Sequence, residues 1–224
     1  MALPVHLSWG QKVRALAALF ITFGFTLGTA ETVNFDRVRP NSFPPGWTIQ
    51  GPGSESLPRW QVAFDRTAPS RPNVLAPSTT RSRRPEASLA LFDRGSFQNG
   101  EVSVDLKFVA GRLDRSGGVV WRFQDPANYY FAVVSPNKDT VGIYRKVNNE
   151  VTLLEPSTVS HPVEQDMWNV LRVVFKGDRF TLYFGHRKLL DVRDSAISAA
   201  GKTGVWTKTN TLAYFDNFRL SRHD

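Results

Sequence analysis

The stretch that decides the fold is residues 169–193, NVLRVVFKGDRFTLYFGHRKLLDVR. Three runs rich in Val, Leu, Phe and Tyr are separated by two short turn signals, Lys176-Gly177-Asp178 and Gly185-His186. Turns this short join antiparallel strands, because a parallel partner needs a crossover of about a dozen residues. The segment therefore predicts a three-stranded antiparallel meander.

The same pattern covers the chain from residue 89 onward, where short apolar or alternating runs are separated by turn residues. No window repeats apolar residues every 3.6 positions over three turns, and residues 194–200 could form one helical turn at most. The sequence therefore predicts an all-β sandwich of antiparallel strands. Residues 31–88 are less regular and predict an edge strand and loops. The expected strands are Leu89–Phe92, Glu101–Val109, Gly118–Gln124, Tyr129–Ser135, Thr140–Val147, Val151–Glu155, Asn169–Lys176, Arg179–Phe184, Lys188–Arg193, Gly204–Lys208 and Leu212–Leu220.

The composition narrows the classes of protein. The 224 residues include no cysteine, which excludes a disulfide scaffold, thiolate-bound zinc, iron–sulfur clusters and a cysteine nucleophile. With 41% hydrophobic and 21% charged residues, the chain can bury enough apolar surface to form a core. The length favours one domain.

The first thirty residues have the order of a secretory signal peptide. Lys12 and Arg14 precede an acid-free apolar run from residue 15 to 27, and Gly28 and Ala30 fit the positions before a cleavage site. We expect cleavage between Ala30 and Glu31, a single mature domain over residues 31–224, a secreted or periplasmic location, and no membrane span after cleavage.

The charge balance is basic, with a formal net charge of +8. The signal segment holds 2 of the 28 Lys and Arg residues and no acid, so 26 remain against 20 Asp and Glu, a net of +6. Several of these arginines lie in residues 68–85, a Pro/Ser/Thr-rich stretch that reads as an exposed basic loop. Because it lacks interleaved aromatics, no specific nucleic-acid partner is expected.

Four ordered motifs carry a resemblance to a known family. They are GGVVWRFQDPANYY at 117–130, WNVLRV at 168–173, GKTGVWTK at 201–208 and YFDNFRL at 214–220. The chain resembles, from about Phe35 to Leu220, the secreted bacterial concanavalin A-like jelly rolls grouped with the 3-keto-disaccharide hydrolase domain and, more distantly, laminarinase-type glucanases. The resemblance implies a two-sheet jelly roll whose concave face binds a saccharide.

Catalytic acids are not evident. Retaining glucosidases of this fold carry Glu-x-Asp-x-x-Glu on one strand, since alternation places i and i+2 on one face. The nearest run here is Glu101 to Asp105, which fits a half-buried strand with a solvated polar face. No catalytic residue is assigned, and an enzyme, if the chain is one, would be a glycoside hydrolase of the 3-keto-disaccharide type.

A saccharide site needs apolar rings together with charged or amide groups for the hydroxyls. Regular alternation would place Trp121 in the core and Arg122 on the opposite, exposed face. We therefore predict Arg122, with Tyr130 and Trp206 beside it, as the binding residues. The alternatives are core packing for the two aromatics and an ion pair of Arg122 with an acid of residues 101–105. The wider set of candidates is Trp121, Arg122, Tyr129, Tyr130, Trp206 and Lys208.

Asp216 is the candidate metal ligand. It lies between Phe215 and Phe218, where an unpaired acid is costly. The resemblance implies that this aspartate can help hold a structural calcium together with backbone carbonyls of the N-terminal segment. The alternative is an Asp216 that faces solvent or caps a turn. No other cofactor is expected.

These observations favour an exported, monomeric domain that binds carbohydrate or polysaccharide. A hydrolase of the 3-keto-disaccharide type is the alternative. The third possibility is a non-catalytic surface-interaction domain.

Overall fold

The computed structural model describes residues 30–51, 59–77, 86–110, 115–158, 163–208 and 210–223. Strands account for most of these residues, and the described ranges contain no α-helix, only a 3-10 turn at Pro136–Lys138. The all-β prediction is confirmed. Within the same ranges no helix is long and apolar enough to cross a membrane.

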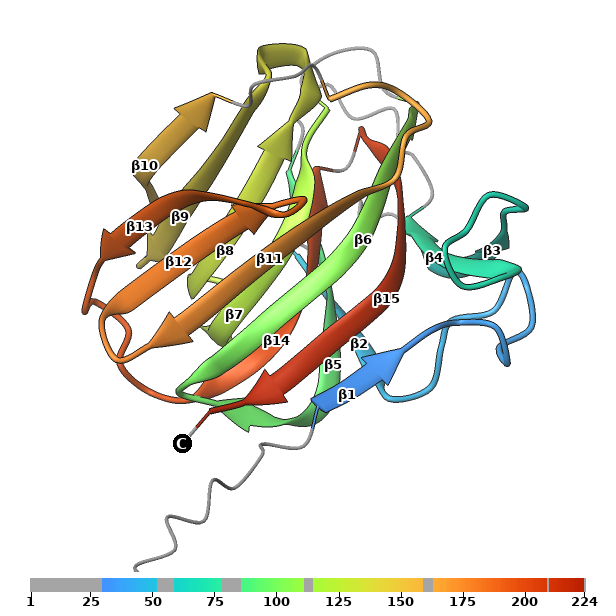
Figure 1. Cartoon of the computed structure of the whole chain (residues 1–224). Coiled ribbons are helices and arrows are strands. Elements are labelled where there is room, and N and C mark those ends of the chain that lie inside the picture. The colour runs from blue at the N-terminus through green and yellow to red at the C-terminus, as the bar shows by residue number, and fades with distance from the viewer. Residues whose placement is uncertain are drawn as a thin grey trace, which may run out of the picture.

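The strands form two antiparallel sheets that pack face to face (Figure 1). The first, called here the eight-stranded sheet, lies in front in that view, and β1 joins it by pairing with β15. Its strands are β13 (Arg187–Arg193), β12 (Arg179–Phe184), β11 (Asn169–Lys176), β6 (Gly100–Ala110), β15 (Leu212–Arg222), β4 (Asn73–Pro77), β3 (Trp60–Phe64) and β1 (Ala30–Val33).

The second, the seven-stranded sheet, lies behind it in Figure 1. Consecutive strands β7 to β10 run as a meander, and β14 inserts between β7 and β5. In spatial order its strands are β10 (Glu150–Thr158), β9 (Thr140–Val147), β8 (Asn128–Ser135), β7 (Gly117–Asp125), β14 (Gly201–Lys208), β5 (Ala87–Phe97) and β2 (Trp47–Gln50).

The main core fills the space between the sheets. Alternate residues of each strand point inward, as the twofold period of a strand requires. Trp121 of the seven-stranded sheet meets Phe180 of the eight-stranded sheet, with ring centroids 5.4 Å apart, and both side chains are fully buried. The predicted core position of Trp121 is thereby confirmed.

Most predicted strands are present. Three of them, at residues 140–147, 169–176 and 179–184, have the predicted bounds. Residues 31–88 hold four strands, β1 to β4 and the start of β5, rather than one edge strand and loops. The prediction of an exposed loop at 68–85 is also wrong in part, because residues 73–77 form β4 and are buried. Residues 78–85, and residues 1–29 of the predicted signal segment 1–30, lie outside the described residues, while Ala30 begins β1.

Candidate functional site

The outer face of the seven-stranded sheet, which points away from the other sheet, carries a second apolar cluster. None of its members is more than 7% exposed. They are Leu89, Leu91, Val120, Phe123, Tyr129, Phe131, Val133 and Trp206. A sheet face turned toward solvent usually carries polar side chains, so this cluster marks the face as a candidate binding surface.

Three aromatic rings of this face form a row across the strands. Trp206 of β14 stacks on Phe131 of β8 at 5.2 Å, and Phe131 stacks on Tyr144 of β9 at 5.1 Å. Phe131 and Tyr144 are direct cross-strand partners, which sets their rings side by side. Because the ring faces cover one another, the row offers a ligand chiefly apolar ring edges.

A pocket of about 440 Å³ lies over this row. Its volume is within the range of small-molecule sites in proteins, about 300–1,000 Å³. The floor is apolar and the rim is polar. The lining residues are Glu86, Ala87, Ser116, Tyr129, Phe131, Val133, Ser135, Lys138, Tyr144, Lys146, Asn149, Val151, Trp206 and Lys208.

Lys146 is held in place at one end of the pocket. Its ammonium donates a 2.8 Å hydrogen bond to the carbonyl of Pro126 and lies 5.6 Å from the centre of the Tyr129 ring. Burial lowers the pKa of Lys146, and the nearby carboxylate of Asp125 offsets part of that effect. The lysine is therefore a partly desolvated cation that faces the pocket.

The opposite end of the pocket is held by hydrogen bonds between three strands. The hydroxyls of Ser116 and Ser135 lie 3.2 Å apart. The carbonyl of Ser116 accepts from the Thr207 hydroxyl at 3.0 Å and from the backbone N–H of Lys208 at 3.2 Å. These bonds fix the start of β7 beside the ends of β8 and β14, so the pocket wall is rigid there.

Trp206 and Tyr129 bring polar groups to the apolar floor. The indole N–H of Trp206 is buried beside the Tyr129 hydroxyl but makes no hydrogen bond of normal geometry to any described residue. Burial raises the pKa of Tyr129 to about 12, which the indole offsets only in part. Tyr129 therefore stays a neutral phenol at neutral pH, and the indole N–H remains a donor that the fold does not use.

A second pocket, of about 420 Å³, adjoins the first on the same face. Phe123 lines the second pocket and stacks at 5.6 Å on Tyr129, which lines the first. Pro126, which accepts the hydrogen bond from Lys146, also lines the second pocket. The other lining residues include Gln50, Gln124, Asp125 and Lys202.

Of the three predicted binding residues, only Trp206 lies in this site. Tyr129 and Lys208, which belonged to the wider set, line the same pocket. Tyr130 and Arg122 point to the other side of the sheet and are buried, with 0% and 1% exposure. The structure therefore does not bring Arg122, Tyr130 and Trp206 together.

The prediction that Arg122 is exposed is wrong because β7 is irregular at this residue. The register of β7 shifts against both neighbouring strands here, and Arg122 adopts a positive φ of 48°. A bulge of this kind turns the side chain off the face that regular alternation assigns. The guanidinium donates to the carbonyls of Gln98, Gly177 and Ile197 at 2.6–3.0 Å and forms no ion pair with Glu101 or Asp105. Burial lowers its pKa.

Tyr130 has a structural role in the core. Its ring stacks on Trp121 at 5.7 Å, and its hydroxyl donates to the Asp194 carboxylate while accepting from the backbone N–H of Ile197. Burial, with the neighbouring Asp194, raises the pKa of Tyr130. Asp194 is in turn paired with Arg145 at 2.6 Å. The core packing that was the alternative for Tyr130 is the arrangement found.

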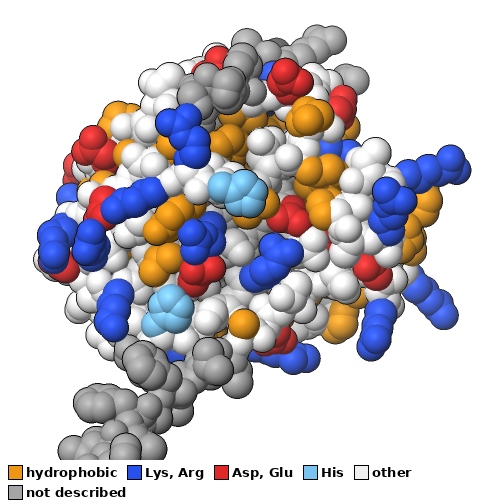
Figure 2. All heavy atoms as spheres, viewed as in Figure 1, with side chains coloured by type: hydrophobic (Ala, Val, Ile, Leu, Met, Phe, Trp, Pro, Cys, Tyr) orange, Lys and Arg blue, Asp and Glu red, His pale blue; other side chains and the backbone are white. Residues whose placement is uncertain are grey.

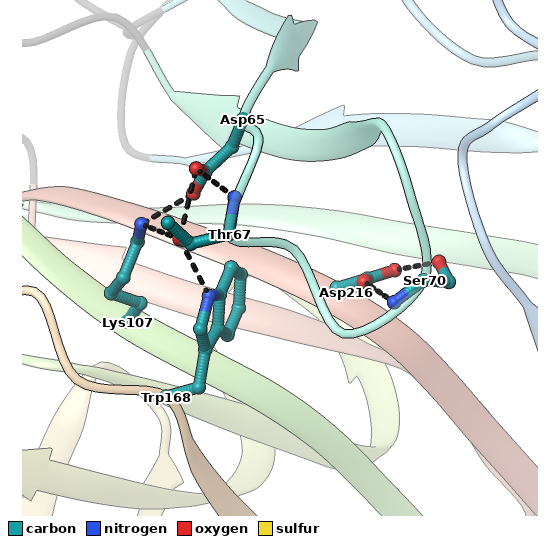
Figure 3. Close-up of polar contacts among 6 residues, drawn as sticks. All are labelled: Asp65, Thr67, Ser70, Lys107, Trp168 and Asp216. Atoms are coloured by element: carbon teal, nitrogen blue, oxygen red, sulfur yellow. Dashed lines mark hydrogen bonds and ion pairs between the residues drawn. The ribbon is translucent and has the colours of Figure 1, made fainter.

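Asp216 is fully buried on the eight-stranded sheet, where hydrogen-bond donors surround it (Figure 3). The Ser70 hydroxyl and the Asn217 N–H donate to Oδ1, and the Ser70 N–H donates to Oδ2, each at 2.7 Å. Calcium needs six to eight oxygen ligands. Among the described residues no group of three or more acidic or histidine side chains could hold a metal. Calcium binding at Asp216 stays a prediction, and the hydrogen-bond donors on both of its carboxylate oxygens do not favour it.

The acidic strand noted in the sequence lies on the sheet opposite to the pocket. Val102 and Val104 of β6 are fully buried in the core, while Glu101 pairs with Arg172 at 3.0 Å on the outer side. Asp105 accepts a 2.8 Å hydrogen bond from Asn217. Ser103 and Asp105, which share the outer face with Glu101, are only 3% and 6% exposed, so the prediction of a half-buried strand with a solvated polar face at 101–105 is wrong in part.

Sequence reasoning missed Phe131, Tyr144 and Lys146. A signal was present, because residues 129–134 read Tyr-Tyr-Phe-Ala-Val-Val and are apolar at every position. In a strand with one solvated face, apolar and polar residues alternate. A strand that is apolar on both faces has each face covered by other parts of the protein or by a ligand. That reading would have drawn attention to the outer face of β8.

Comparison with known proteins bears on the fold. No protein-family model matches the chain, and no curated protein matches its sequence. Among solved structures, the carbohydrate-binding module CBM66 from Bacillus subtilis is 21% identical, with a TM-score of 0.59, 79% of this chain covered and 96% of that chain. A β-glucanase from Bacillus licheniformis is 10% identical, with a TM-score of 0.60. The alignment covers 88% of this chain and 99% of the glucanase. The exoplasmic/lumenal domain of VIP36, bound to Ca²⁺ and Man3GlcNAc, is 13% identical, with a TM-score of 0.54. The alignment covers 80% of this chain and 85% of the VIP36 domain. At such identities the likeness establishes the fold, a concanavalin A-like jelly-roll sandwich.

Proposed function

We propose that this chain binds carbohydrate in the pocket on the outer face of the seven-stranded sheet. The observation that carries the proposal is the row of Trp206, Phe131 and Tyr144 beneath a polar rim. A sandwich needs no such cluster for its core, since the main core between the sheets is separate. The cluster is therefore better explained by a ligand.

The pocket has the chemistry that a sugar requires. The C–H groups of a sugar ring can rest on the apolar floor, while its hydroxyls can meet the ammonium of Lys146 and the amide of Asn149 at the rim. The neutral phenol of Tyr129 can donate or accept. The solved structures that share this fold include a carbohydrate-binding module, a saccharide-bound VIP36 domain and a β-glucanase, which supports a carbohydrate ligand here.

Binding is favoured over hydrolysis by the number of acids in the pocket. Glycoside hydrolysis uses two carboxyl groups about 5–5.5 Å or about 6.5–9.5 Å apart. The described lining of the first pocket holds one, that of Glu86. The acids of β6 face the opposite side of the molecule. A hydrolase of the 3-keto-disaccharide type has no observation here that favours it.

A glycan array followed by calorimetric titration with the best oligosaccharide tests the proposal. Tyr144→Ala should weaken binding at least tenfold, because it removes the end of the aromatic row. Tyr183→Ala is the matched control, since Tyr183 is half-buried on the other sheet under Arg172. Equal loss in both variants, or no glycan bound by the folded protein, would contradict the proposal. Turnover of a 3-keto-glucoside above a heat-killed control would favour the hydrolase.

We also propose export of the chain, on the strength of residues 1–30 alone. N-terminal sequencing of the protein from culture medium or periplasm should begin at Glu31. A sequence that begins at Met1 would contradict cleavage.

A further inference from the structure

The hydroxyl of Tyr129 is a hydrogen-bonding group that the fold leaves unused. Tyr129 lines the first pocket and is only 2% exposed. Among the described residues, the polar group that acts on this hydroxyl is the indole N–H of Trp206, which lies beside it without forming a hydrogen bond of normal geometry. No other described residue donates to the hydroxyl or accepts from it.

Tyr130, the next residue, shows how the fold satisfies a buried phenol. Its hydroxyl donates to the Asp194 carboxylate and accepts from the backbone N–H of Ile197 at 3.0 Å. Nearly all buried polar groups in folded proteins have such a partner, so a buried hydroxyl without one needs an explanation. A ligand in the pocket supplies that explanation for Tyr129.

Trp206 determines which side of the Tyr129 hydroxyl a ligand meets. An indole N–H can only donate, so it lies on the lone-pair side of the phenol oxygen. In agreement, the indole offsets part of the rise that burial causes in the pKa of Tyr129. The phenol hydrogen is the part left over. Tyr129 therefore presents a donor to the pocket.

Two more polar groups lie at this end of the pocket. Lys146 is the cross-strand partner of Tyr129, and one of its three N–H groups donates to the carbonyl of Pro126. Asn149, in the turn between β9 and β10, lines the pocket, and its side-chain amide bonds to no described residue. This end therefore combines the phenol and ammonium donors with an amide that can donate or accept.

An apolar surface begins directly beside these donors. Phe131 is two residues after Tyr129 on the same face of β8, is 4% exposed, and its ring centroid lies 5.4 Å from that of Tyr129. A ligand group that accepts from Tyr129 therefore has an apolar neighbour within the reach of a small substituent. The group that fits best joins an acceptor to an apolar end.

A sugar hydroxyl fits this end less well than a carbonyl does. A hydroxyl that accepts from Tyr129 brings a hydrogen of its own, which needs a further acceptor, whereas a carbonyl oxygen accepts twice and brings none. An acetamido group supplies the carbonyl, an apolar methyl for Phe131, and one N–H that the side-chain oxygen of Asn149 can accept. It is thus the common sugar substituent that matches all three features.

Polar side chains on the outer face of the eight-stranded sheet are used differently. There Arg172 pairs with Glu101 at 3.0 Å, and Arg193 pairs with Asp178 at 2.7 Å. Figure 2 shows basic and acidic side chains interspersed over this face. These groups bind one another, whereas the Tyr129 hydroxyl lines a pocket.

We propose that the first pocket selects a saccharide that carries an acetamido group, whose carbonyl accepts from the Tyr129 hydroxyl while its methyl rests on Phe131. This inference rests on the proposed function and specifies its ligand class.

The test uses pairs of glycans that differ only by a hydroxyl or an acetamido group at C2 of the sugar. One pair is cellotetraose and chitotetraose. The other is an array glycan that ends in galactose and its counterpart that ends in N-acetylgalactosamine. In calorimetric titration the acetamido member of at least one pair should bind at least tenfold more tightly. The glucosamine tetramer, which has the nitrogen without the acetyl group, should bind no better than cellotetraose.

A single-atom variant assigns the preference to the pocket. Tyr129→Phe keeps the ring and removes the hydroxyl, so it should weaken the acetamido glycan at least fivefold and change its hydroxyl counterpart less than twofold. Tyr183→Phe is the matched control, because Tyr183 is half-buried on the other sheet. Melting curves of both variants verify that they remain folded.

The failures are distinguishable. Equal affinity for the two members of both pairs, or an acetamido preference that survives in Tyr129→Phe, overturns this inference and leaves carbohydrate binding intact. A glucosamine tetramer that binds as tightly as chitotetraose also overturns it, since the acetyl group would then play no part. No binding of any glycan by the folded protein overturns the proposed function itself.

Discussion

Arg122 carries a positive charge into the interior of the sandwich, where no carboxylate of the described residues pairs with it. Its guanidinium instead binds three carbonyls, in the β5–β6 turn, the β11–β12 turn and the β13–β14 connection. One side chain thereby ties three connections together at one end of the molecule. The same arginine was the first choice for a binding residue, because a regular strand would have exposed it. A bulge depends on packing around the strand, so a pattern of alternation cannot reveal it.

Arg122→Met should destabilise the fold by about 2–4 kcal/mol, because the carbonyls of Gln98, Gly177 and Ile197 all lose their donor. Urea unfolding measures the loss. Arg193→Ala, which removes an exposed ion pair, should have little effect. Saccharide affinity per folded molecule should stay the same in Arg122→Met. A variant as stable as the wild type that fails to bind would restore Arg122 to the site.

The buried carboxyl group of Asp216 predicts how the stability of the fold depends on pH. Burial raises its pKa in the folded state above the usual 3.8, although the Ser70 and Asn217 donors counteract this. A raised folded pKa means that its contribution to stability is greatest below pH 3.8 and declines as pH rises through the folded value. The stability of the wild type minus that of Asp216→Asn should therefore fall between pH 3.5 and 7 in urea unfolding. A difference that grows with pH would contradict the raised pKa of Asp216.

The same residue tests whether calcium stabilises the fold. Because hydrogen-bond donors occupy both carboxylate oxygens of Asp216, excess chelator should leave the melting temperature unchanged. Ser70→Ala should lower it. A melting temperature that falls with chelator and recovers with added calcium would show that the ion binds after all.

At the scale of elements, the β3–β4 hairpin is held to the sandwich mainly by side chains. β4 pairs with β15 at a single position, Leu75 with Phe215. Two polar contacts then fix the loop that joins β3 to β4, namely Ser70 with Asp216 and Asp65 with Lys107 (Figure 3). Lys107 also donates to Thr67 at 2.7 Å. These polar contacts add to the apolar packing of Trp60, Val62 and Leu75, which belong to the main core.

Lys107→Met should loosen this lobe. Asp65 would remain buried without its cation, which costs about 3–5 kcal/mol for a buried pair. Burial alone would raise the pKa of Asp65, but hydrogen bonds from Lys107 and Thr67 lower it below 3.8. Hydrogen exchange should rise in residues 60–77 while β7 to β9 stay protected. The double variant Lys107→Met/Asp65→Leu should recover part of the stability, and a double variant less stable than the single one would contradict this reading.

Individual strands show which parts of the fold can be predicted from sequence patterns. β9, β11 and β12 were predicted with their bounds, because short turn signals and clear β-forming runs define them. β4 was missed because all five of its residues are buried, so no alternation shows, and Pro and Arg residues surround it. In the site, Trp206 was identified, while Tyr144 was not, because its place beside Phe131 comes from strand pairing that is long-range in sequence.

At the scale of the whole molecule, the two sheets present different outer faces. The eight-stranded sheet carries paired charges and the β3–β4 lobe, and the seven-stranded sheet carries the aromatic row and two adjoining pockets. The family resemblance pointed to the fold, and the arrangement of side chains distinguishes one face from the other.

The adjoining pockets predict that affinity depends on ligand length. Together they extend past Tyr129 to Phe123 and Gln124, so a longer ligand can contact both pockets. A hexasaccharide should bind at least tenfold more tightly than a disaccharide of the same sugar in calorimetry, and Gln124→Ala should reduce that ratio. Equal affinity for the two lengths would confine the ligand to one pocket.

The most direct measurement of the central claim follows the tryptophan indole signals by NMR while the tightest-binding glycan from the array is added. Trp206 lines the pocket, whereas Trp121 lies in the core and Trp168 lies against Lys107 on the other sheet. The account predicts a saturable shift of the Trp206 indole N–H, with the Trp121 and Trp168 signals unchanged. A saturable shift of Trp168 with Trp206 unmoved would place the saccharide on the wrong sheet and contradict the account.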